Sequence, residues 1–290
     1  MTVGRRTLLV AALLVAAPIA GCNTAPADGE ATAPTVTPAP VPTDDAGRAV
    51  ASGSDPGGGS ALPAVGGEGP VSAADIAGTH REALLATSFT RTVTETIRGP
   101  NGTVRRTERT VRVEPDPLTY YYARNQTVEE GYPVRAFAPR FELWSNESHA
   151  ISRTVRDGSV SYRIDSASAY GEAVTEITGN EALLALLGVF EFRVERAGGG
   201  YHLRSTALVD RERLPTPTLT ENATNATMTA WVSERGIVRS YRVAYDVRRD
   251  GRRLRVIERA EVSAVGETSV ERPPWYGAAV ENASRSSERR

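Results

Sequence analysis

The chain has 290 residues, a formal net charge of -1, and 40% hydrophobic but only 6% aromatic residues. This near-neutral balance gives no indication of nucleic-acid binding, and a single cysteine excludes a disulfide within the chain. All 34 basic residues are arginines, which keep their charge in every protein environment. The composition predicts a globular protein with a mostly aliphatic core and no nucleic-acid partner.

The first 21 residues have the pattern of an export signal. Arg5 and Arg6 form a short basic region, and an apolar run extends from Thr7 to Ala20. The run has 14 residues, whereas a helix that crosses a bilayer needs about 20. We therefore expect a signal peptide over residues 1–21 and treat an uncleaved transmembrane helix as the weaker alternative. The arginine pair also matches a twin-arginine export signal, although an ordinary basic region would look the same.

Cys22 is the only cysteine, and it follows the small residues Ala20 and Gly21. The sequence Ile19-Ala20-Gly21-Cys22 resembles the lipobox of prokaryotic lipoproteins. A thiolate is the strongest side-chain nucleophile for accepting a lipid. The alternative is a cysteine that follows the signal peptide by chance and carries no lipid. We expect lipidation of Cys22, which would anchor the protein to the extracytoplasmic face of the cell membrane.

Residues 22–70 are rich in Thr, Pro, Ala and Gly and contain no hydrophobic periodicity. Such a composition cannot bury enough apolar surface to form a core. We expect a lipidated cysteine followed by a disordered tether. Residues 71–276 then provide about 205 residues, enough for one globular domain. The polar residues 277–290 are expected to form a disordered tail.

Six of the eight asparagines begin an Asn-x-Ser/Thr sequence. This excess predicts a glycosylated exterior surface, although Asn and Thr are also common in turns. The six candidate sites are Asn101, Asn125, Asn146, Asn222, Asn225 and Asn282.

The domain pattern begins with a helix, for which Ser72 provides the N-cap, and changes to strand alternation at about residue 89. Turn signals at Asn101-Gly102, Asp157-Gly158, 198–200 and Asp250-Gly251 separate alternating segments. These segments predict about nine or ten antiparallel strands. We expect an α+β fold that is mainly antiparallel: a curved meander sheet, half-barrel or barrel-like, with an N-terminal helix and a short inserted helix.

The inserted helix, residues 180–187, is almost entirely apolar and must lie against an apolar surface. Its leucines either complete a filled core or cover an open ligand cavity, and we expect Leu184→Ala to reduce stability in the first case. These possible lid residues are Leu183, Leu184, Leu186 and Leu187.

Catalytic chemistry has no recognisable pattern in this sequence. His80, His149 and His202 are isolated and lack metal-ligand spacing. The arginines of the second strand, at 105, 106, 109 and 112, are expected to lie on a solvated face. We therefore predict no catalytic, cofactor-binding or metal-ligating residues, no cofactor, and a protein that is not an enzyme.

Four segments resemble recurrent segments of an uncharacterised haloarchaeal surface lipoprotein family: 141–146, 179–187, 233–241 and 270–276. That family has no established activity. The arrangement of helix, meander, inserted helix and meander is more distantly similar to the half-barrel of bacterial lipoprotein carriers, which implies a sheet that binds acyl chains on its concave face.

We therefore expect a membrane-anchored extracytoplasmic lipoprotein of the cell envelope, with a structural or interaction role. The alternative is a carrier or binding protein for a lipid or other apolar ligand. The sequence leaves the oligomeric state open.

Overall fold

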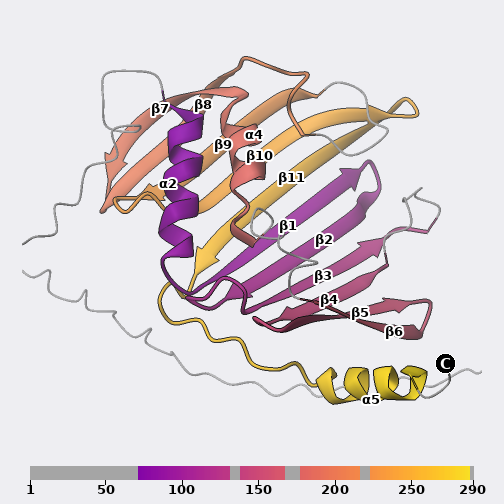
Figure 1. Cartoon of the computed structure of the whole chain (residues 1–290). Helices are drawn as coiled ribbons and strands as arrows, with labels where there is room; N and C mark the ends of the chain where they lie inside the picture. Colours follow the sequence, from indigo (N-terminus) through magenta and orange to yellow (C-terminus); the bar gives the residue numbers. More distant parts are fainter. Residues whose placement is uncertain (1–70, 131–137, 167–176, 216–222, 288–290) are drawn as a thin grey trace, which may run out of the picture. The chain divides into compact units, whose positions relative to one another are not determined.

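One antiparallel sheet of eleven strands organises the domain, together with three helices (Figure 1). The computed structural model describes residues 71–130, 138–166, 177–215 and 223–287, which all belong to one unit. The strands are β1 Phe89–Gly99, β2 Gly102–Val113, β3 Tyr120–Val128, β4 Arg140–Ser145, β5 His149–Arg156, β6 Ser159–Ser166, β7 Phe190–Ala197, β8 Gly200–Leu208, β9 Thr224–Ser233, β10 Val238–Arg249 and β11 Arg252–Ser263. The helices are α2 Ala73–Leu85, α4 Asn180–Leu187 and α5 Tyr276–Ser287. The predicted α+β class is confirmed.

The sheet consists of two meanders that meet at its centre. Strands β1 to β6 follow one another across one half, and β7 to β11 across the other. The halves join where β1 pairs antiparallel with β11, with Val93 opposite Ala260. Within the described residues, the outermost strands β6 and β7 do not pair, so the sheet stays open. Of the two expected forms, the half-barrel is confirmed.

Three hairpins use two-residue turns in which both residues have positive φ. These turns are Asp157-Gly158 (49° and 78°), Gly198-Gly199 (51° and 81°) and Asp250-Gly251 (49° and 72°). Such turns match the right-handed twist of the flanking strands, and the sequence predicts all three. The β1–β2 turn lies one residue earlier than the predicted turn at Asn101-Gly102. Gly99 is opposite Gly102, so Pro100 and Asn101 form the turn.

Helices α2 and α4 pack beside each other over one face of the sheet, the inner face (Figure 1). The side chain of Ser72 caps α2 by accepting a hydrogen bond from the Asp75 N–H at 3.2 Å, as predicted. Ile76 of α2 packs into a cluster with valines of the central strands, and Leu84 into a second cluster with Phe89. The apolar stripe of α2 thus closes the core over both halves of the sheet.

Helix α5 contacts β5 and β6 (Figure 1). The rings of Tyr276 and Trp144 meet edge to face, with centroids 5.2 Å apart, on the face opposite α2 and α4, which we call the outer face. Ala279 is fully buried. The expectation of a disordered tail over residues 277–290 is therefore wrong for residues 277–287, which belong to α5. Alanines and the Glu281–Arg285 pair favour a helix, and the aromatic contacts fix it to the sheet.

Within the described residues, no helix combines the length and apolar character needed to cross a membrane.

Candidate functional site

A pocket of about 380 Å³ lies between α4 and the inner face of the sheet. This volume falls within the range of small-molecule sites, roughly 300–1,000 Å³. Ala182 and Leu186 of α4, together with Pro215, form the apolar wall. The floor comes from central strands and is mostly polar. Its polar residues are Arg91, Glu95, Arg109, Tyr122, Tyr241, Tyr245 and Glu258.

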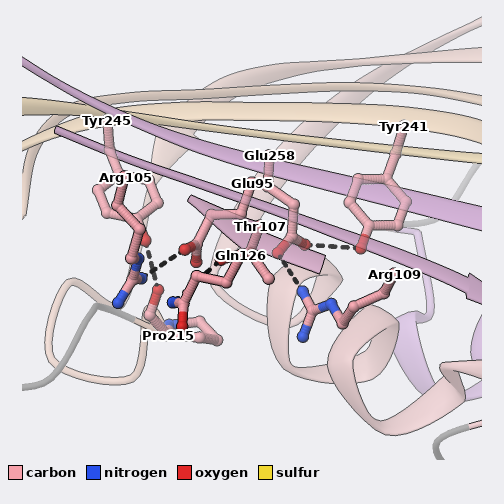
Figure 2. Close-up of polar contacts among 9 residues, drawn as sticks. All are labelled: Glu95, Arg105, Thr107, Arg109, Gln126, Pro215, Tyr241, Tyr245 and Glu258. Atoms are coloured by element: carbon pink, nitrogen blue, oxygen red, sulfur yellow. Dashed lines mark hydrogen bonds and ion pairs between the residues drawn. The ribbon is translucent and has the colours of Figure 1, made fainter. Parts of the chain in front are cut away.

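Two ion pairs lie along this floor (Figure 2). Arg105 of β2 pairs with Glu95 of β1, and Arg109 Nη2 lies 3.1 Å from Glu258 Oε2 on β11. The Tyr241 hydroxyl donates to the other carboxylate oxygen of Glu258 at 2.8 Å. The network therefore connects three neighbouring strands and Tyr241 of β10.

The two carboxylates are direct cross-strand neighbours, because the β1–β11 register places Glu95 opposite Glu258. Like charges at opposed positions destabilise a sheet. Arg105 and Arg109 offset that repulsion, with one guanidinium for each acid. The pocket floor thus carries closely spaced groups of both signs.

Burial fixes the protonation of the floor. It raises the pKa of Tyr241, and the carboxylate of Glu258 raises it further. Burial also raises the pKa of Tyr245, whose hydroxyl donates to the Pro215 carbonyl at 2.8 Å (Figure 2). For Arg109, burial acts to lower the pKa, but Glu258 and other neighbours outweigh it, so the pKa is raised. Neutral phenols and a permanent cation therefore face the pocket.

Gly179, just before α4, allows the helix to approach the sheet. Its φ of +72° is strained for other residues, and a Cβ at this position would overlap the guanidinium of Arg91. Arg91 is only 9% exposed. The start of α4 therefore rests directly on a buried arginine of the pocket floor.

His80 of α2 connects three parts of the domain. The Val238 N–H donates to His80 Nδ1 at 3.1 Å, so the proton belongs on Nε2, which lies 3.2 Å from the Thr178 carbonyl oxygen. Burial lowers the pKa of His80 to about 4; the Thr178 contact acts to raise it, and the charge of Arg91 adds to the lowering. His80 is thus a neutral structural bridge that positions α4.

The possible lid leucines divide into two groups. Leu183, Leu186 and Leu187 are buried and pack into the core cluster, and Leu186 also lines the pocket. Leu184 is 41% exposed, so the expectation that its loss reduces stability has no structural support. The helix therefore completes a core, which was the first expected alternative, and also borders a pocket, which was the second.

The predicted modification sites that the structure describes are spread along the chain, and none of them lines the pocket. Cys22 and Asn222 lie outside the described residues. Asn101, Asn125 and Asn282 are exposed, whereas the Asn146 side-chain oxygen accepts two backbone hydrogen bonds in the β4–β5 turn. Asn225 differs because its Nδ2, the atom that would carry a glycan, donates to Asp246 at 2.9 Å.

The charged floor is the feature that sequence reasoning missed. Arg91 and Glu95 alternate with Phe89, Val93 and Ile97 on the inner face of β1, and Glu258 interrupts the apolar positions of β11 in the same way. Arg105 and Arg109 also point inward, so the expectation that all four β2 arginines lie on a solvated face is wrong for these two. Residues two apart lie on the same face of a strand. A charged residue between apolar ones at this spacing is therefore the sequence signal for an inward-facing charge.

We also searched the described residues for a metal site. In the parts of the chain that the structure describes, no three His, Cys, Asp or Glu residues form a group that could hold a metal ion. His149 lies against Tyr276, and His202 lies beside Trp231 with ring centroids 6.4 Å apart.

The fold and the pocket define an open, mainly antiparallel α+β domain with one polar-floored pocket under a short helix. No protein-family model and no curated protein matches the chain, so the haloarchaeal resemblance gains no support. A solved structure, "Crystal structure of LolA superfamily protein NE2245 from Nitrosomonas europaea", matches with a TM-score of 0.23 and 11% identity, over 70% of this chain and 96% of that one. A TM-score this low carries no argument about function.

Proposed function

We propose that the protein is a membrane-anchored, extracytoplasmic lipoprotein whose domain binds a small amphipathic ligand in the pocket under α4. The carrying observation is the pocket itself: about 380 Å³ with an apolar wall and a floor of arginine, glutamate and tyrosine. The apolar part of the ligand would contact Leu186 and Ala182. Its polar end would meet Arg109, Tyr241 and Glu258. This narrows the expected ligand, a lipid or other apolar molecule, to one that has a polar end.

The energetics of the floor support this proposal. The four side chains of the two ion pairs are only 17–33% exposed. Taking an ion pair out of water is costly, and apolar replacements of similar volume are often neutral or stabilising. A core built only for stability would not need Glu95 and Glu258 side by side. Their presence where α4 leaves a cavity fits a site that recognises a polar group.

A second candidate, an envelope protein without a ligand, has one observation in its favour. Leu183, Leu186 and Leu187 already fill a core beneath α4. The two functions differ in whether the remaining cavity takes up a molecule.

A substitution on α4 tests the pocket without touching the core. Ala182 lines the pocket and Ala185 does not, although both are exposed on α4. The probe is 1-anilinonaphthalene-8-sulfonate, an aromatic amphiphile with one anionic group, titrated by fluorescence. We expect saturable binding to the wild type and to Ala185→Trp, and at least tenfold weaker binding to Ala182→Trp, because the indole fills the cavity.

The role of the floor is tested with the same probe without its sulfonate, N-phenyl-1-naphthylamine. We expect it to bind at least tenfold more weakly than the sulfonate. Equal binding to both tryptophan variants, with unchanged unfolding midpoints, would support the envelope protein without a ligand.

The anchor is tested separately. Cys22→Ser removes the only thiol, so we expect the wild type to partition with membranes and the variant to be released largely into the soluble fraction. Mass spectrometry of the native protein should show the lipid mass only in the wild type. Retention of both forms in the membrane would instead indicate an uncleaved apolar helix.

A further inference from the structure

The outer face of the sheet carries a groove of about 550 Å³ on the side away from the α4 pocket. It extends over strands β1, β11, β10 and β9. Threonines of β1 line one side, Trp231 of β9 lies on the other, and Arg242 and Arg259 lie between them. The groove thus combines hydroxyls, guanidinium groups and one large aromatic ring.

The two central arginines are direct neighbours of like charge. The β10–β11 register places Arg242 opposite Arg259, and both are exposed. Among the residues that the structure describes, neither side chain forms an ion pair or a hydrogen bond. Opposed like charges destabilise a sheet. An anion bound between them would offset this repulsion, because two guanidinium groups can both donate hydrogen bonds to one carboxylate, sulfate or phosphate.

The positive charge continues in a line across the sheet. Arg242 is opposite Thr229 on β9, and Thr229 is opposite Arg204 on β8. Strands lie about 4.8 Å apart, so the row Arg259–Arg242–Thr229–Arg204 spans roughly 14 Å. Glu108, beyond the opposite end of this row, is neutralised by Arg106. Glu261 is the one acid among the residues that line the groove, against three arginines besides Arg106. A row of this length suits an extended chain that carries several negative charges.

The other lining groups favour a carbohydrate among the possible polyanions. Trp231 is half-buried beside His202, and an aromatic face of this kind stacks on the apolar face of a sugar ring. Thr92, Thr94 and Thr96 lie on the outer face of β1 and offer hydroxyls for hydrogen bonds. A flat membrane would need protruding apolar side chains, whereas these side chains line a recess.

We propose that this outer groove binds an anionic carbohydrate chain, with carboxylated or sulfated sugars held by Arg242 and Arg259 and one ring stacked on Trp231. The site is separate from the pocket under α4, because it lies on the opposite face of the sheet. It would allow a lipid-anchored domain to hold a surface polysaccharide.

The test uses the full chain and isothermal titration with a heparin octasaccharide at 150 mM NaCl. We expect saturable binding by the wild type, at least tenfold weaker binding by the double variant Arg242→Ala/Arg259→Ala, and unchanged binding by Arg211→Ala/Arg213→Ala. The control pair removes the same charge from an exposed loop. The unfolding midpoint of the groove variant should stay equal or rise, because the repulsion between the two arginines is removed.

Further ligands separate the classes of partner. Neutral maltooctaose should not bind, and Trp231→Ala should weaken octasaccharide binding at least fivefold, with recovery in Trp231→Phe. Equal affinity of the groove and control variants would overturn the site. Equal or tighter binding of a single-stranded oligonucleotide, or of anionic vesicles, would overturn the assignment to carbohydrate.

Discussion

Leu183→Ala is expected to lower the free energy of unfolding by about 2–5 kcal/mol, the usual cost of a large-to-small change in a filled core. Leu183 is only 2% exposed and packs into the main core cluster. The same substitution at Leu184 should cost less than about 1 kcal/mol, because 41% of Leu184 is exposed to solvent. Urea unfolding of both variants measures the difference.

The pair is internally controlled, since both substitutions exchange the same residues in the same helix and carry the same change in helix propensity. Similar losses at both positions would mean that Leu184 is buried. A small loss at Leu183 would mean that α4 is not part of the cooperative core.

The second large effect is a loss of stability in mild acid that depends on His80. Its pKa is about 4 in the folded protein, below the ordinary value of about 6.5. Between these values the unfolded chain binds a proton that the folded protein does not. The stabilisation is therefore fully present above about pH 6.5 and is lost as the pH falls to 4, by about 3 kcal/mol in total.

His80→Gln provides the comparison, because an amide can accept from the Val238 N–H and donate to the Thr178 carbonyl without titrating. The difference in unfolding free energy between wild type and variant should shrink or reverse as the pH falls from 6.5 to 4. Carboxylates that titrate in the same range are common to both proteins and cancel. A difference that stays constant with pH would contradict a neutral His80.

Much of the architecture can be predicted from local patterns. Period-two alternation and Asp-Gly or Gly-Gly turns predict the hairpins, because both signals act within a few residues. The N-cap at Ser72 is equally local. The C-terminal helix α5 is harder to predict from local sequence, because it depends on the contact of Tyr276 with Trp144, a residue more than a hundred positions earlier.

The candidate site depends on the register between strands far apart in the sequence, so most of it could not be predicted from the sequence. Nothing local indicates that Glu95 will lie opposite Glu258, because that neighbourhood depends on the pairing of the first strand with the last. The leucines of α4 show the same limit. The sequence identifies an apolar helix, but only packing distinguishes the buried Leu183 from the exposed Leu184.

The central β1–β11 pairing also has a kinetic consequence. Within the described residues, nine of the ten strand pairings join consecutive strands, and only β1–β11 closes a loop on the order of 150 residues. Each meander can form early from nearby contacts, while the central pairing must wait for a slow, entropically costly encounter. Until then the edges of β1 and β11 are exposed to wrong partners. Glu95 and Glu258 lie on these two strands, so we expect the pocket under α4 to be completed only when the central pairing forms.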